Sequence, residues 1–172
     1  MKFPIPFLPW TGRASLEVEI PDNTEEKFRL KIALEVAVKA RANLAGAYLA
    51  GANLADAYLA GANLADANLA DAYLAGAYLA GAKIRNGLVL VGDRPFLQIG
   101  PIGSRCAQLR AYVTEKGVYI EAGCFFDTLN QFAVAVENEH GSNRHGDEYR
   151  AAIALIEAHA RHWTPAKKAE AA

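Results

Sequence analysis

The stretch from Ala42 to Asn86 reads, in blocks of five, ANLAG AYLAG ANLAD AYLAG ANLAD ANLAD AYLAG AYLAG AKIRN. All nine blocks keep one register. Alanine is first, leucine is third until Ile84 replaces it in the last block, and Gly, Asp or Asn is fifth. A fixed internal period of this kind indicates a repeat architecture. The repeat therefore decides the fold of this part of the chain.

A period of five excludes a plain helix and a flat strand. On an α-helix, five residues advance by about 140° net, so the leucines would circle the axis. On a flat strand, successive leucines would alternate between the two faces. The pattern is consistent if the chain turns after every block, with the first and third residues pointing inward and the second outward. Gly, Asp and Asn at the fifth position suit such turns. We expect coils filled by Ala and Leu.

The blocks resemble the A(D/N)LXX motif of the pentapeptide-repeat family over residues 42–86. The resemblance implies a right-handed, four-sided β-helix with four blocks per coil, so nine blocks would make just over two coils. Tyr stands at four second positions, where the family commonly has Asp or Asn. Stacked repeats need covered ends, because an open coil presents unpaired strand edges.

The N-terminal residues are expected to supply one cover. Residues 1–14 contain three prolines and look irregular, and residues 15–20 alternate as a strand does. Asn23 and Glu26 have the spacing of a capping box, which predicts a helix to about residue 41. Its apolar residues at a spacing of four are Phe28, Ile32 and Val36, and the apolar surface is widened by Leu30, Leu34 and Val38.

After Gly87 the period breaks and a different pattern begins. Short strands are predicted at 88–91, 96–99, 109–113 and 118–122, with a turn at 100–103. Helices are predicted at 128–139, with Asp127 or Thr128 as N-cap, and at 147–163, with a polar loop between them. The predicted fold class is a β-helix plus α+β: a short right-handed quadrilateral β-helix, capped by an N-terminal strand and helix, followed by a small domain of β-strands and two helices. The predicted parts are 1–41, 42–86, 87–165 and a flexible tail, 166–172.

Three further segments, GPIGSR, AGCFF and HGDEYRAAIALIEAH, resemble a segment of small uncharacterised proteins of bacteriophages and prophages. This resemblance covers roughly residues 97–163 and brings no established chemistry. It implies a phage-encoded protein.

The chain contains no nucleotide-binding, hydrolase or metalloprotease motif. The best constellation for catalysis is Cys124 with His140 or His145, because a thiol beside an imidazole can act as a nucleophile with its base. Cys124 is more simply a small apolar residue beside aromatic ones. His159 and His162 lie three residues apart and could supply metal ligands, but no second ligand pair shows a recognised spacing. We expect no enzyme, no cofactor and no metal.

The outward positions of the repeat are the first candidate site. Tyrosines are common in interface cores, and asparagine offers both a donor and an acceptor, so the candidate binding residues are Tyr48, Asn53, Tyr58, Tyr73 and Tyr78. Alternatively, Tyr and Asn favour strands and form ladders without binding anything. The acids Asp56, Asp66 and Asp71 fall on three different corners, which argues against a DNA-like row of charges.

A second candidate site is a small anion site, for example for a nucleotide. Its residues would be Arg105, Arg144, His145 and Arg150, around the segments 100–105 and 140–150, with Arg110 as a further arginine. A third hypothesis is an enzyme that uses Cys124 and a histidine.

Composition excludes several classes of partner. The net charge is −1, so neither nucleic acid nor an acidic membrane is expected as a direct partner. No signal peptide and no apolar run of membrane-spanning length is recognised, which predicts a cytoplasmic protein.

The expected function is to engage and inhibit or sequester a host protein, such as a defence or DNA-processing component. Self-association is a further expectation.

Overall fold

The coil of residues 42–86 repeats every 20 residues. In the computed structural model, which describes residues 1–163, parallel bridges pair Asn43 with Asn63, Tyr48 with Asn68, Asn53 with Tyr73, Tyr58 with Tyr78, and Asn63 with Lys83. Four blocks therefore complete one coil, and nine blocks make just over two, as predicted. The predicted tail, 166–172, lies outside the described residues.

The corners of the coil explain the fifth residue of each block. At all nine fifth positions φ lies between +54° and +75°, in the left-handed region. Gly adopts this region without strain, and Asp and Asn tolerate it better than other residues. A β-branched residue at these corners would be strained, which is why the fifth position is restricted.

The interior of the coil is filled by the first and third residues. Leu44, Leu49, Leu54 and Leu59 are fully buried in the first coil, while Leu69 in the second coil is half-buried. Tyrosines at the second position point outward and are exposed. The inward and outward assignment made from the sequence is confirmed.

The N-terminal residues form more regular structure than the sequence indicated. Strand β1 (Lys2–Ile5) pairs antiparallel with β2 (Leu16–Glu19), so the prediction that residues 1–14 are irregular is wrong over β1. Pro4 is tolerated because β1 lies at the edge of a two-stranded sheet, where a missing N–H costs little.

Helix α1 (Glu26–Lys39) is present, but its predicted cap is wrong, and of its predicted apolar surface only Leu34 is fully buried. Its N-cap is Glu25, without a side-chain bond, so no capping box forms at Asn23. Its buried residues are Ala33, Leu34 and Ala37, whereas Phe28 and Val36 are exposed. Charged residues on α1 also reach the coil, so the apolar spacing alone did not locate the packed face.

The N-terminal segment satisfies the backbone edge of the first coil on all four of its sides. On the first block, Arg13 donates from both guanidinium nitrogens to the carbonyls of Asn43 and Ala45, each at 2.7 Å. Segment 6–8 bonds the backbone of Gly46 and Tyr48 in strand-like fashion.

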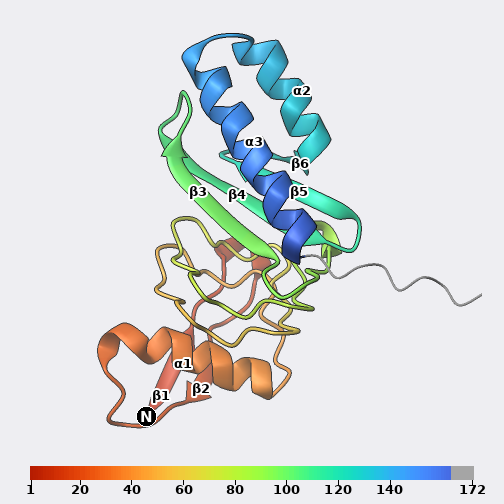
Figure 1. Ribbon diagram of the computed structural model, residues 1–172. Coiled ribbons are helices and arrows are strands. Elements are labelled where there is room, and N and C mark those ends of the chain that lie inside the picture. The colour runs from red at the N-terminus through yellow and green to blue at the C-terminus, as the bar shows by residue number, and fades with distance from the viewer. Residues whose placement is uncertain (164–172) are drawn as a thin grey trace, which may run out of the picture. The chain divides into compact units, whose positions relative to one another are not determined.

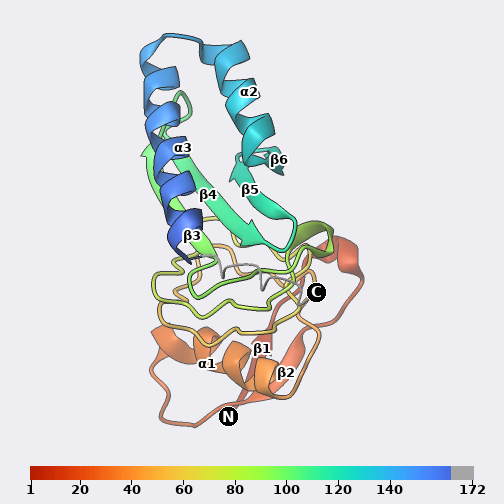
Figure 2. The ribbon, with the colours of Figure 1, turned by 45° about the vertical axis from the view of Figure 1, so that its right-hand side comes forward.

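Helix α1 covers the other two sides. Lys31 donates to the carbonyl of Ala55 at 2.7 Å, and the Glu35 carboxylate accepts from the N–H of Tyr58 at 3.0 Å. Figures 1 and 2 show α1 with β1 and β2 at this end of the coil. The expected N-terminal cover is therefore made largely by hydrogen bonds to an edge that would otherwise be unpaired.

The chain divides into two compact units, residues 1–89 and the residues from 90 onward. The second unit contains an antiparallel sheet in the order β3-β4-β5-β6. The strands are β3 (Phe96–Ile102), β4 (Ala107–Thr114), β5 (Gly117–Ala122) and β6 (Phe125–Thr128). Helices α2 (Leu129–His140) and α3 (Arg144–Trp163) cover one face of it (Figure 1). Leu109, Ala111 and Ile120 of the sheet pack there against Phe132, Val136 and Ile156.

Several boundaries of the second unit differ from the prediction. Strand β3 continues through Gly100 and Pro101, which were predicted as a turn, with a register shift between Ile99 and Ile102. Helix α3 begins three residues before the predicted start, because Asn143 Oδ1 accepts from the N–H groups of His145 and Gly146. The predicted N-cap Thr128 is confirmed by its bond from the N–H of Gln131.

Candidate binding face and cavity

The four tyrosines of the repeat lie on three sides of the coil. Tyr58 stacks directly over Tyr78, with ring centroids 6.0 Å apart, and we call this pair the tyrosine ladder. Both rings are about 60% exposed. Tyr73 pairs with Asn53 on a neighbouring side, and Tyr48 pairs with Asn68 on the side opposite the ladder, half a turn away. The stacking of Tyr58 over Tyr78 was predicted from the 20-residue spacing and is confirmed.

Asparagine at the second position of a block stabilises the backbone turn that follows it. The side-chain oxygens of Asn43, Asn53, Asn63 and Asn68 each accept from the backbone N–H two residues later, at 2.9 to 3.3 Å. Asn63 also donates to Asn43 Oδ1 at 2.8 Å. Such bonds stabilise the turn that follows. The candidate residue Asn53 therefore has a local structural role, whatever else it contacts.

The acidic residues of the coil are separated from one another, as predicted. Asp56 lies over Gly76, so that a Cβ placed on Gly76 would lie 2.1 Å from Asp56 Oδ1. With a period of 20, Asp66 falls in line with Gly46 and Asp71 with Gly51. Each acid therefore stacks on a glycine and no row of carboxylates forms.

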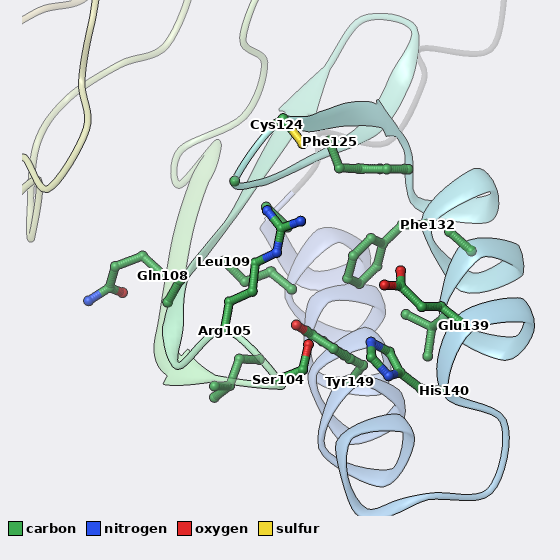
Figure 3. Close-up of a pocket in the computed structure, with 16 residues that line it drawn as sticks. Ser104, Arg105, Gln108, Leu109, Cys124, Phe125, Phe132, Glu139, His140 and Tyr149 are labelled. Atoms are coloured by element: carbon green, nitrogen blue, oxygen red, sulfur yellow. The ribbon is translucent and has the colours of Figure 1, made fainter.

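A cavity of about 270 Å³ opens in the second unit on the helix-covered side of the sheet (Figure 3). Its walls come from the β3–β4 turn, the β5–β6 turn, α2 and one residue of α3. The apolar wall is made chiefly by Ile102, Leu109, Phe125, Phe132 and Val136, and the polar wall by Ser104, Arg105, Gln108, Cys124, Glu139, His140 and Tyr149.

Two glycines shape the rim of the cavity. A Cβ on Gly103 would lie 2.0 Å from the Tyr149 hydroxyl, and one on Gly123 would lie 2.8 Å from an Arg105 guanidinium nitrogen. Both glycines also have φ above +60°. They allow Tyr149 and Arg105 to lie flat against the two turns, so the positions of these side chains depend on the absence of a neighbouring side chain.

The predicted segments 100–105 and 140–150 do come together. Glu148 accepts from the N–H of Gly103 at 2.8 Å, and Tyr149 stacks on His140 with centroids 5.4 Å apart. Of the four candidate residues, Arg105 lines the cavity. Arg144 is exposed and His145 packs on His140, and neither lines the cavity.

The fourth candidate, Arg150, is already engaged by acidic partners. It donates to Glu137 and Asp147, each at 2.7 Å, and to the carbonyl of Gly141. The hydrogen bonds to Asp147 and Glu137 raise the pKa of the guanidinium. An incoming anion would have to compete with two carboxylates. Arg150 is therefore better placed to join α2 to α3 than to hold an anion.

Cys124 and His140 line the same cavity, which is the arrangement that the enzyme hypothesis requires. Within residues 1–163, however, no hydrogen bond joins them, and His140 is in ring contact with His145 and Tyr149. Asp147 and Glu148 are bound to Arg150 and Gly103. The same residues contain no group of three or more His, Cys, Asp or Glu side chains arranged to hold a metal.

Sequence reasoning missed most of the cavity wall, including Ser104, Gln108, Glu139 and Tyr149. Ser104 and Tyr149 were covered only by the predicted segments 100–105 and 140–150 and were not named as candidates. The glycines at the turns, Gly103 and Gly123, were the signal present in the sequence, because each marks a close approach of another group.

Comparison with known families supports the reading of the first unit. The family model described as pentapeptide repeats matches residues 40–72 and 52–86, with eight copies. Residues 40–86 are pentapeptide repeats. No match was found among curated proteins or among solved structures.

Pentapeptide repeats are generally structural and interaction elements, so they direct attention to the outer surface of the coil and not to its filled interior. The tyrosine ladder is part of that surface. Separately, no helix among residues 1–163 combines the length and the apolar character needed to cross a membrane.

Proposed function

We propose that this chain is a non-enzymatic binding protein that engages another protein through the tyrosine-bearing sides of its pentapeptide repeats, centred on the tyrosine ladder. The observation that carries the proposal is the difference between Asn and Tyr at the second position of the block.

Asparagine at this position contributes to the turn, and tyrosine does not. The side-chain oxygens of all four asparagines accept a hydrogen bond from the backbone N–H two residues later. The Tyr hydroxyl, at the far end of a rigid ring, cannot reach that N–H. A hydrogen bond of this kind contributes roughly 0.5–1.5 kcal/mol. At five of the nine blocks, four with Tyr and one with Lys83, the chain forgoes this bond, so the needs of the turn do not explain the tyrosines.

The chemistry of the face suits a protein partner. Tyr offers a large apolar surface and a polar hydroxyl at low entropic cost, and it is enriched at interface hot spots. Tyr58 and Tyr78 present two such rings side by side, each about 60% exposed. Nucleic acid is disfavoured because the outer positions carry few basic groups, and mimicry of DNA is disfavoured because Asp56, Asp66 and Asp71 stand on separate corners.

The finer form of the proposal is that the partner is a host protein that a phage-encoded chain inhibits or sequesters. It is supported by the resemblance of residues 97–163 to phage and prophage proteins. The second unit would supply a further surface or a contact between copies of the chain.

The test is a double substitution, Tyr58→Asn with Tyr78→Asn, in an affinity pulldown from a bacterial host extract. The variant should stay folded, because each new Asn gains a turn bond that offsets the lost ring contact of about 0.5–1.5 kcal/mol. A protein captured by the unmodified chain should be lost from the variant.

The matched control is Leu155→Gln, which removes an exposed apolar side chain from α3 of the other unit. It should leave capture unchanged, and this result would separate binding at a specific surface from non-specific hydrophobic adsorption. Equal capture of the same protein by a folded double variant would overturn the proposal.

A further inference from the structure

The cavity of the second unit has no part in the proposed function, yet it has the features of a small-ligand site. It is concave, partly apolar and lined by a few convergent polar groups, which is the usual make-up of such sites. At about 270 Å³ it falls below the range of about 300–1,000 Å³ that is typical for drug-sized ligands. Its occupant would therefore be a small metabolite.

The floor of the cavity is held rigidly and is apolar. Leu109, Phe132 and Val136 are buried core residues. Phe132 packs edge-on against Phe125 at 5.4 Å and against Tyr149 at 5.6 Å, measured between ring centroids. An apolar group of a ligand that packs against this floor would be removed from water without displacing the buried core residues.

Two opposite charges face the cavity from opposite walls. Figure 3 shows Arg105 on the side of the β3–β4 turn and Glu139 on the side of α2, with Phe132 between them. Neither residue forms an ion pair with any residue in the described part of the chain. By contrast, Arg110 and Arg150 of the same unit are paired with carboxylates.

The guanidinium of the exposed Arg105 lies over Gly123. It stands 2.8 Å from the point where a Cβ of residue 123 would be, so a side chain at 123 would displace it. A cation placed in this way, facing a separate anion across an apolar floor, matches a ligand that carries both charges and an apolar group.

We propose that this cavity binds a free α-amino acid with an apolar side chain. Arg105 binds the carboxylate, Glu139 binds the ammonium group, and the side chain lies on the floor formed around Phe132. Ser104 and His140 supply further hydrogen-bonding groups at the wall. This proposal narrows the expectation of a small anion: Glu139 disfavours a ligand that carries only negative charge, and the volume disfavours a nucleotide.

The test measures binding by calorimetry and by thermal shift, with L-leucine and L-phenylalanine as probes at up to about 10 mM, which reaches affinities in the millimolar range. N-acetyl-L-phenylalanine lacks the cation and L-phenylalanine amide lacks the anion. Each should bind about tenfold or more weakly than the free amino acid, as expected for the loss of one charge-assisted bond.

Two variants assign the roles of the side chains. Arg105→Gln should abolish the response to the free amino acids. Glu139→Gln should also weaken them, while it improves the relative binding of the N-acetyl compound. Arg144→Gln removes an exposed arginine outside the cavity and should bind as the unmodified chain does.

Three results would overturn the proposal: no binding of either amino acid, equal binding of the blocked compounds, or Arg105→Gln and Glu139→Gln behaving like the control. The blocked compounds test the unmodified chain, so the outcome does not depend on the variants folding. Failure here would leave the tyrosine-ladder proposal untouched, since the two sites belong to different units.

Discussion

Substituting Gly76 by Asp tests whether side chains at stacked corners interact across 20 residues of sequence. Gly76 lies in line with Asp56, and its Cβ would stand 2.1 Å from Asp56 Oδ1. Aspartate is compatible with the corner itself, because Asp56, Asp66 and Asp71 already have φ of 54–55°. Gly81 is the matched control: its φ is +75° against +70° for Gly76, and its Cβ would meet only the backbone of Gly61, at 3.7 Å.

The expected difference follows from charge and space. Two unit charges about 4 Å apart repel by about 1 kcal/mol in water and by about 4 kcal/mol at an effective dielectric constant of 20. Both corners are exposed, so we expect about 1–2 kcal/mol from repulsion and displacement of the Asp56 side chain. Gly81→Asp should cost only the backbone term of roughly 1 kcal/mol that both variants share.

Urea unfolding at pH 7 and low salt measures the free energies of unfolding of the two variants. The difference between the two free energies should shrink at 1 M salt, where the screening length is about 3 Å. Adding Asp56→Asn to Gly76→Asp should remove most of the repulsion. Equal destabilisation of the two variants, or a difference that salt and Asp56→Asn both leave unchanged, would refute the proposed stacking of the two corners.

Two further predictions concern the cores of the two units. Leu54→Ala should lower the free energy of unfolding by about 2–5 kcal/mol, because Leu54 is fully buried. Leu69→Ala, at a half-buried position, should lower it by about half as much. Urea titrations that give equal losses for the two variants would contradict this prediction. Burial and the neighbouring Glu121 carboxylate raise the pKa of Tyr112 well above its ordinary value, so the folded state keeps the phenol proton longer than the unfolded state does. The stability contributed by neutral Tyr112 is therefore complete below about pH 10 and is lost as pH rises through the folded pKa. Tyr112→Phe should make the free energy of unfolding fall less steeply at alkaline pH. An unchanged dependence on pH would exclude Tyr112 as the cause of the decline.

Local signals in the sequence predicted the local features well. The N-cap at Thr128 and the hairpin between β4 and β5 were predicted from residues next to them in the chain. Asn143 carried an N-cap signal of the same kind, which would have placed the start of α3 correctly. The buried face of α1 was obtained only in part, through Leu34, because Ala33 and Ala37 are small and give no strong periodic signal.

The cavity, by contrast, could not be predicted from local signals in the sequence. Its wall joins the β3–β4 turn, the β5–β6 turn, α2 and α3, and no spacing in the chain relates Arg105 to Glu139. Only the packing of two helices on one face of the sheet brings these charges to the same space. The sequence indicated that Arg105 was a candidate, but it gave no partner for it.

By itself, the sequence determined the repeat. A five-residue period with Ala and Leu inward and a turn-compatible fifth residue predicts stacked coils, and the resemblance to pentapeptide repeats implies four blocks per coil, so that each block repeats its environment 20 residues later. That determined the corners, the buried leucines and the ladder of Tyr58 over Tyr78. The tertiary structure alone decided what meets the coil edge and what surrounds the cavity. The bonds of Arg13, Lys31 and Glu35 to the first coil join residues far apart in the chain, and such contacts depend on three-dimensional packing that no period encodes.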